Sequence, residues 1–549
     1  MVALLVVLVS AAVLAFLYWW FANRWKPADK EWCVMFYLTS QVPRSSTPIS
    51  RPDEETGVPA GATLDQKLDQ VVDTIRMLPC SLSKPAPPWD NAYVAYRAIW
   101  ADVQRDPEAR VVSGDPAAPT ATYFSGESIY DVGLAFDLST DITDFFMWVY
   151  ENCPANHYAV FFWGHAMGPG GLFQQSERPL VISPLVRLIV QFTSWLAGFT
   201  GTTNQWAGVP GIASLQKALH SVVVSRIAKM GGTSAMTLPV GALPTVPPPS
   251  SGSPGSSSAS TTTPPQVLQV PKVEVVLFQD CWMAGIETAF ELQDDVRYIV
   301  ASQSIVPIGY RPGGTLGAVW PYQELIECMM AAPNTFGPQL LQKLEGFFNA
   351  NPNNRWPMLK VLFSLMDCAM DLGKVTAALQ DPFQKLVTAL DMIGPEQRSK
   401  LIDQAFAQSG RLFEMDGNRI AVGDQALIDV PTMSHYLSVP TSWPANVVVS
   451  ADEAKAIADA AKTLQKAMVT VVVTNFESPT PITASNLPYS GLTALYKSYA
   501  IFGEDSYIVN NTYRSSYDMF RFATETSVPA TVAGEIRSWA DFAFERTEW

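Results

Sequence analysis

Two stretches of apolar sequence, each ending in a chemically reactive residue, decide the fold of this chain. The first is H-Y-A-V-F-F-W-G-H-A-M-G-P-G-G (His157–Gly171), in which an apolar run ends at His165 and a glycine-rich loop. The second is V-E-V-V-L-F-Q-D-C-W-M-A-G-I-E (Val273–Glu287), in which an apolar run ends at Asp280 and Cys281. Apolar runs of this length are typical of strands that are buried on both faces of a parallel sheet.

Further apolar runs alternate with helical patterns along the chain. The predicted strands are Trp32–Thr39, Ala92–Trp100, Tyr158–Trp163, Val273–Phe278 and Tyr298–Ala301. The predicted helices are Leu64–Met77, Thr143–Asn152, Leu215–Ala228 and Gly285–Leu292. Alternation of strands and helices favours an α/β sandwich with a mostly parallel sheet.

The second half of the chain has a different pattern. After about residue 330 it becomes mainly helical, and Ser450 with Glu453 forms a capping box before an alanine-rich helix from 451 to about 468. A β-rich run, Val469–Asn475, follows. The predicted organisation is an anchor (1–26), an α/β domain (27–330) with an insertion (172–270) that contains a Pro/Ser-rich linker (244–265), and a mainly helical accessory domain (331–549).

Residues 2–22 form an apolar run without charge, which is long enough to cross a bilayer as a helix. Arg24, Lys26 and Lys30 follow this run, so the positive-inside rule predicts a single-pass membrane protein with a cytoplasmic body. The alternative is a cleaved signal peptide, but the charged n-region is missing. Residues 180–199 are a second apolar stretch, which either contacts the bilayer interface or packs on its own domain.

The composition excludes several classes of function. The net charge is -15 and there is no basic stretch, so a nucleic-acid partner is not expected. The six cysteines show no C-x-x-C pair and there is no H-E-x-x-H, so neither a metal site nor a cofactor is expected. Four cysteines lie in apolar or helical patterns and are interpreted as buried free thiols, while Cys80 stays open: Cys33, Cys153, Cys328 and Cys368.

The reactive residues of the two decisive stretches are a thiol and an imidazole. The carboxyl ends of neighbouring parallel strands line the ligand crevice of an open α/β sheet, so His165 and Cys281 could meet there. An imidazole beside a thiol favours the thiolate and supplies a proton to a leaving amine. The other histidines lack this position and are interpreted as solvated or helix-face residues: His157, His220 and His435.

The order of these motifs resembles the clostripain-like cysteine peptidases, which are related to caspases and gingipains. The matching stretches are Asn156–Gly171, Val273–Glu287 and Val300–Pro307, with weaker similarity at Trp32–Tyr37, Asp144–Ala155 and Ser364–Asp367. The resemblance covers most of residues 31–400. It implies a caspase-like three-layer αβα sandwich and a cysteine endopeptidase that acts on a protein or peptide substrate.

The resemblance also implies a role for individual residues. Cys281 would attack the scissile carbonyl and His165 would transfer protons, while the backbone amides of Cys281 and Ala166 would bind the oxyanion. The family usually has Gly where Ala166 stands. The candidate pocket residues are Gln279, Asp280 and Ser304. Relatives that cleave after Arg or Lys carry Asp at the position of Gln279, so weak selectivity for these residues is expected; Asp280, shifted by one, should point elsewhere.

The insertion between His165 and Cys281, 116 residues apart, offers an exposed segment for activation by self-cleavage. The leading interpretation is a membrane-anchored prokaryotic endopeptidase, and the calcium dependence of some relatives is left open. One alternative is a catalytically weak or inactive pseudopeptidase that acts as a membrane-tethered binding module. Another is an exported digestive peptidase.

Overall fold

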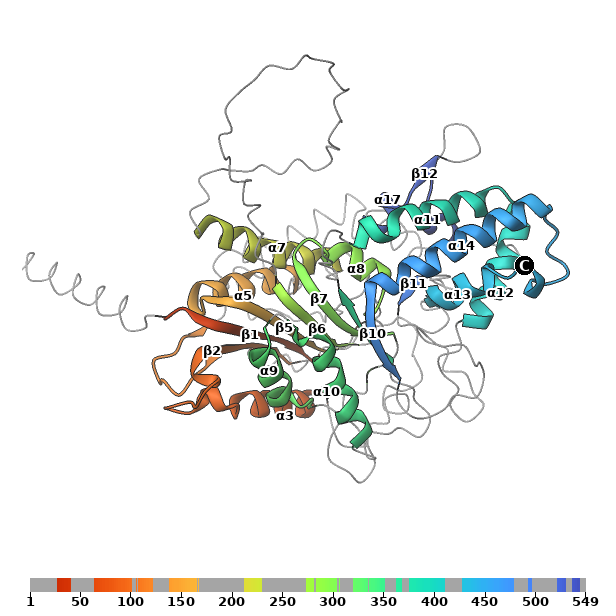
Figure 1. Cartoon of the computed structure of the whole chain (residues 1–549). Coiled ribbons are helices and arrows are strands. Elements are labelled where there is room, and N and C mark those ends of the chain that lie inside the picture. Colours follow the sequence, from red (N-terminus) through yellow and green to blue (C-terminus); the bar gives the residue numbers. More distant parts are fainter. Residues whose placement is uncertain are drawn as a thin grey trace, which may run out of the picture.

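A nine-stranded sheet forms the centre of the molecule, with the strand order β10-β8-β7-β6-β5-β1-β2-β3-β4 (Figure 1). The computed structural model describes residues 27–40, 64–100, 105, 107–121, 138–164, 166, 212–229, 273–280, 283–303, 306, 319–333, 335–350, 362–367, 375–409, 427–477, 492–495, 521–529 and 536–543. The five central strands run parallel and are β1 (Lys30–Thr39), β2 (Ala92–Ile99), β5 (Ala155–Trp163), β6 (Val273–Gln279) and β7 (Val296–Ser302). All five were predicted from their apolar runs.

Antiparallel strands complete the sheet on both sides. They are β3 (Glu108–Val112), β4 (Thr120–Ala121), β8 (Leu362–Asp367) and β10 (Val472–Glu477). Strand β8 contains the Ser364–Asp367 motif that was assigned to the helical region. It is a strand because it pairs with the edge of β7, where Ala301 lies opposite Ser364.

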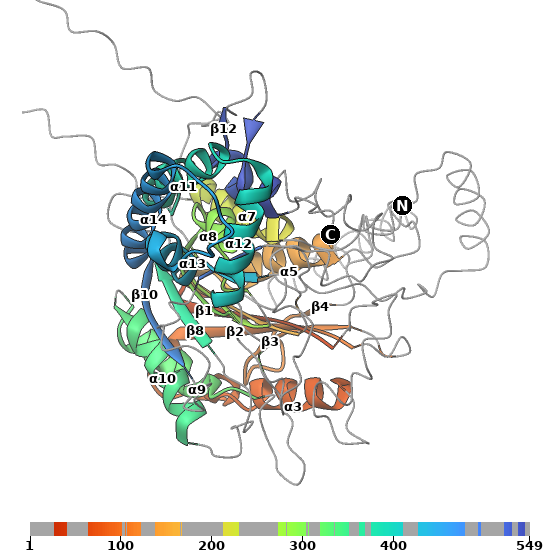
Figure 2. The same ribbon diagram turned by 90° about the vertical axis from the view of Figure 1, so that its right-hand side faces the viewer.

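Helices cover both faces of the sheet (Figure 2). On one face lie α3 (Leu64–Arg76), α9 (Tyr322–Ala331) and α10 (Phe336–Ala350). On the other lie α5 (Leu138–Asn152), α7 (Ile212–Lys229) and α8 (Ile286–Leu292). Consecutive side chains of β1 show why both faces are apolar: the Phe36 ring meets Tyr322 of α9 at 5.1 Å, and the Tyr37 ring meets Phe145 of α5 at 6.1 Å.

The C-terminal half contributes to the same sheet. Its helices are α11 (Val375–Asp391), α12 (Pro395–Ser409), α13 (Val430–Leu437), α14 (Ala451–Val471), α17 (Arg521–Glu525) and α18 (Trp539–Ala543). The predicted capping box is confirmed at α14, where the Ser450 amide donates to Glu453 Oε2 at 2.7 Å and the Glu453 amide to Ser450 Oγ at 3.2 Å. Because β8 and β10 belong to the central sheet, the predicted domain boundary at residue 330 divides the sheet itself.

The predicted membrane location is corrected by the structure. Across the helices that the structure describes, none combines the length and the apolar character needed to cross a bilayer. The two stretches on which the prediction depended, residues 2–22 and 180–199, lie outside the described residues. The predicted linker 244–265 lies outside them as well.

Candidate active site

The carboxyl ends of β5 and β6 lie side by side. The two strands pair in parallel with Trp163 opposite Gln279, the last residue of each strand, and Gly164 and Asp280 follow. The predicted catalytic residues His165 and Cys281 come directly after these in the sequence, and both lie outside the described residues. The structure therefore brings together the residues that precede the predicted imidazole and thiol.

The other described cysteines are poor candidates for a nucleophile. Cys33, Cys80 and Cys153 are free and buried, and Cys328 is free and half-buried. Burial raises the pKa of Cys80 to about 12, and it also raises the pKa of Cys33 and of Cys328. A thiol with a raised pKa is protonated at neutral pH and reacts slowly. Among the described thiols, these three are structural.

The remaining histidines lie away from the ends of β5 and β6. His157 is at the start of β5, at the opposite end of the strand, and contacts Glu31 and Glu274 at 3.2 and 3.0 Å. It therefore pairs with carboxylates rather than being solvated. His220 of α7 contacts Asp295 at 2.9 Å, and His435 is an exposed residue of α13.

Gln279, a predicted pocket residue, is buried at the end of β6. Its Oε1 accepts a hydrogen bond from the Tyr322 hydroxyl at 2.7 Å. Burial raises the pKa of Tyr322, so its hydroxyl keeps its proton and remains a donor. The sequence analysis missed Tyr322, because no local pattern links the start of α9 to the end of β6. The third predicted pocket residue, Ser304, lies outside the described residues.

Asp280 is completely buried between the strand ends. Within the described part of the chain, neither of its carboxyl oxygens has a partner at good hydrogen-bond geometry. Burial raises the pKa of Asp280 to about 8, and the nearby backbone N–H of Gly164 offsets only part of this effect. At neutral pH the residue that precedes Cys281 is therefore mostly uncharged.

Residues just after the predicted nucleophile are held by backbone hydrogen bonds. The Ala284 amide donates to the Ser302 carbonyl at 2.9 Å, which joins this segment to the end of β7. The Thr493 amide donates to the Ala284 carbonyl at 2.9 Å. Met283 and Glu287 are buried, as are Ala284 and Thr493. Ala166, the predicted oxyanion residue, is also buried.

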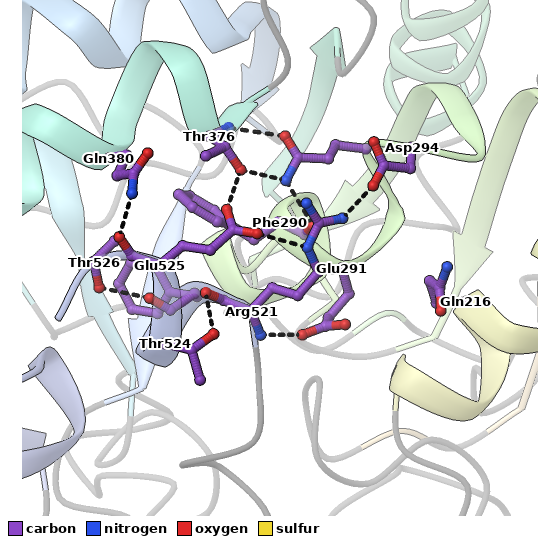
Figure 3. A network of polar contacts seen from close by, with 12 residues as sticks. Gln216, Phe290, Glu291, Asp294, Thr376, Gln380, Arg521, Thr524, Glu525 and Thr526 are labelled. Atoms are coloured by element: carbon purple, nitrogen blue, oxygen red, sulfur yellow. Dashed lines mark hydrogen bonds and ion pairs between the residues drawn. The ribbon is translucent and has the colours of Figure 1, made fainter. Parts of the chain in front are cut away.

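The far end of α8 is held by a polar network (Figure 3). Arg521 contacts Asp294 at 2.7 Å and Glu525 at 2.8 Å, and its amide donates to Glu291 at 2.5 Å. Next to it, Gln293 Nε2 donates to the Thr376 hydroxyl at 2.5 Å. The C-terminal segment thus ties α8, the first helix after Cys281, to α11. Among the described residues, no group of three or more His, Cys, Asp or Glu side chains could hold a metal ion.

The fold sets the ends of β5 and β6 side by side, directly before the predicted imidazole and thiol, and a family match supports the class of cysteine peptidases. Residues 261–481 match the sequence model of the clostripain family, the family that the motifs of this chain resemble. The matched region contains Cys281 and extends through β8 and β10, whereas His165 lies before it. The comparison with curated proteins finds no match.

Solved structures of bacterial peptidases are similar to this chain. An inactive zymogen of a C11 protease from Parabacteroides distasonis is 12% identical, with a TM-score of 0.44, over 91% of this chain and 99% of that one. A secreted C11 cysteine protease from Bacteroides thetaiotaomicron is 12% identical, with a TM-score of 0.44, over 91% of this chain and 100% of that one. A secreted C11 cysteine protease from Bacteroides thetaiotaomicron in complex with an irreversible peptide inhibitor is 13% identical, with a TM-score of 0.43, over 89% of this chain and 99% of that one.

Proposed function

We propose that this cysteine peptidase is an endopeptidase with a caspase-like arrangement, in which Cys281 is the nucleophile and His165 transfers protons. The observation that carries the proposal is the register of β5 and β6, which sets Trp163 opposite Gln279 two residues before each catalytic position. The Cys281 sulfur attacks the scissile carbonyl, and the C–N bond breaks as imidazolium protonates the amine. Water then hydrolyses the thioester. The amides of Cys281 and Ala166 stabilise the oxyanion.

The proposed substrate preference is for an uncharged residue on the carbonyl side of the cleaved bond. Gln279, two positions before Cys281, offers an amide that is already bonded to Tyr322. Asp280 is mostly neutral at pH 7 because burial raises its pKa to about 8. A guanidinium or ammonium buried beside these groups would lack a countercharge, which is costly.

Labelling by a thiol-directed peptide electrophile tests the proposed nucleophile. We expect labelling of the wild-type protein and none of Cys281→Ala. The matched control is Cys328→Ala, which removes a free cysteine of α9. Because burial raises the pKa of Cys328, we expect this variant to be labelled like the wild type. His165→Ala should lower kcat by about 10²-fold or more. Peptide hydrolysis that persists in Cys281→Ala would refute the proposal.

Activation by self-cleavage within residues 172–270 is a second part of the proposal. The insertion separates the two catalytic positions in the sequence and is long enough to hold a processing site. Purified wild-type protein should then yield two fragments on a denaturing gel, while Cys281→Ala stays intact. A single intact band from active protein would exclude self-cleavage.

A pseudopeptidase that only binds peptides is the alternative function. It is favoured by Ala166, which stands where the family usually has glycine and is buried. Binding of a peptide without labelling of Cys281 or turnover would support this alternative.

A further inference from the structure

A small two-stranded sheet from the C-terminal region contacts two segments beside the candidate active site, the one after Cys281 and the one after β7. It consists of β9 (Leu427–Asp429) and β11 (Thr493–Leu495), which pair antiparallel. Asp429 and Thr493 lie directly opposite each other in this pair. We call the two strands the β9–β11 clamp, because each of these two residues holds a different segment of the site.

Thr493 holds the segment that follows Cys281. Its amide donates to the Ala284 carbonyl at 2.9 Å, and its Oγ1 donates to the same carbonyl at 3.1 Å. The next residue of the segment, Gly285, forms a parallel bridge with Thr493. Ala284 and Thr493 are completely buried, so water does not compete for these bonds.

Asp429 holds the end of β7. Its Oδ2 accepts a hydrogen bond from Gln303 Nε2 at 2.8 Å, and its Oδ1 accepts one from the Thr432 amide at 2.8 Å, which caps α13. Asp429 and Gln303 are completely buried. A bond from an amide to a buried carboxylate is stronger than one between neutral groups. Gln303 directly precedes Ser304, the candidate pocket residue.

We propose that Thr493 and Asp429 are positioning residues, which set the backbone after the nucleophile and the loop after β7 in the geometry that catalysis requires. The inference rests on the proposed function of Cys281. It makes the C-terminal region part of the active site rather than an accessory domain. The two contacts are linked, because the residues that make them are cross-strand partners. A displacement of about 1 Å at a catalytic group can cost about 10²-fold in rate.

Thr493→Val tests the first contact, since it removes Oγ1 and keeps the shape and the backbone bonds of the residue. We expect kcat to fall about 10-fold or more with little change in KM. Thr493→Ser, which keeps the hydroxyl, should restore kcat. The matched control is Thr526→Val in the C-terminal segment, where the same change removes a buried Oγ1 bond to the Phe522 carbonyl of 2.5 Å (Figure 3). It should lower the unfolding temperature without lowering kcat.

Asp429→Asn tests the second contact without removing the helix cap, because Asn caps about as well as Asp. It weakens the bond from Gln303, and we expect a loss of kcat similar to that of Gln303→Met. The double variant should lose no more than either single one, since both act through the same bond. Should Thr493→Val fail to fold, this pair carries the test.

The rate at which iodoacetamide alkylates Cys281, followed against pH, separates this proposal from the proposed function. Thr493→Val and Asp429→Asn should shift this profile, and Thr526→Val should leave it unchanged. Wild-type values of kcat and alkylation rate in both clamp variants would overturn the positioning role while leaving the peptidase intact. Hydrolysis that survives in Cys281→Ala would instead refute the proposed function, and the alkylation profile would still report on the clamp.

Discussion

At the end of β6, Asp280 carries a completely buried carboxyl group whose pKa burial raises to about 8. In the unfolded chain an aspartate has a pKa of about 3.9. Between these values the folded protein keeps a proton that the unfolded chain has released. The stability that this proton supports is present below pH 4 and is lost as the pH rises through about 8.

Asp280→Asn removes this titration and keeps the size of the side chain. Between the two pKa values, we expect the free energy of unfolding of the wild type to fall relative to that of the variant by about 1.4 kcal/mol for each pH unit. Above the higher pKa the difference should level off. Urea unfolding at several pH values from 4 to 9 measures this. A difference that stays constant over that range would contradict the buried, protonated state.

Sequence reasoning reached part of the site at this scale. It located Gln279 and Asp280 correctly at a strand end, because an apolar run stops there. It did not identify Tyr322, which is 43 residues from Gln279 along the chain and bonds to it. A contact of this kind leaves no local pattern.

At the scale of elements, α5 is fixed to the sheet by a buried ion pair. Arg97 of β2 donates from Nε to Asp141 of α5 at 3.0 Å, and Tyr37 of β1 donates to the same carboxylate at 2.9 Å. Arg97 is completely buried. Helix α5 precedes β5 directly, so this pair helps to position the strand that leads to His165.

Asp141→Ala removes the carboxylate that pairs with the buried guanidinium of Arg97. We expect the free energy of unfolding to fall by about 3–5 kcal/mol, as measured by urea unfolding. The matched control is Asp381→Ala, which removes the exposed partner of Lys385 in α11 and should cost less than about 1 kcal/mol. Equal losses in free energy of unfolding from the two substitutions would show that the buried ion pair contributes no more to stability than the exposed one.

The antiparallel strands other than β10, which the predicted β-rich run Val469–Asn475 overlaps, mark the limit of prediction at this scale. The five parallel strands were found because burial on both faces makes them almost wholly apolar. Strand β3 (Glu108–Val112) includes charged residues, and β8 was taken for part of a helical region. What makes β8 a strand is the row of backbone groups at the edge of β7, which a window of sequence does not contain.

On the scale of the whole molecule, α8 is held at both ends by parts of the chain that are remote in sequence. The β9–β11 clamp holds its start, and the network around Arg521 holds its end (Figure 3). Phe522 adds apolar packing between Phe290 of α8 and Phe383 of α11, at 5.3 and 5.0 Å between ring centroids. The C-terminal half therefore stabilises the helix that follows the nucleophile.

Arg521→Gln removes the positive charge that pairs with Asp294 and Glu525 and that also acts on Glu291, while the backbone bond to Glu291 remains. We expect it to lower the free energy of unfolding by about 1.5–3 kcal/mol near pH 7.5. The pKa of Glu291 is already raised by burial and by the charge of Glu525, while Arg521 opposes this. The loss of stability in the variant should therefore be smaller at acid pH, because protonation of the carboxylates removes the repulsion that the guanidinium balances in the wild type. Thermal unfolding at pH 5 and pH 7.5 measures the difference, and an equal loss at both values would contradict this explanation.

The sequence by itself determined the central strands, the helices between them, and the residues that follow the ends of β5 and β6. Those features are visible in a short window, because a strand that is buried on both faces is a continuous apolar run and an amphipathic helix repeats every three to four residues. Only the tertiary structure decided that the C-terminal half joins the central sheet and that Thr493 meets Ala284, 209 residues away. Such contacts depend on which buried backbone groups need partners once distant segments have come together, and local periodicity carries no record of that.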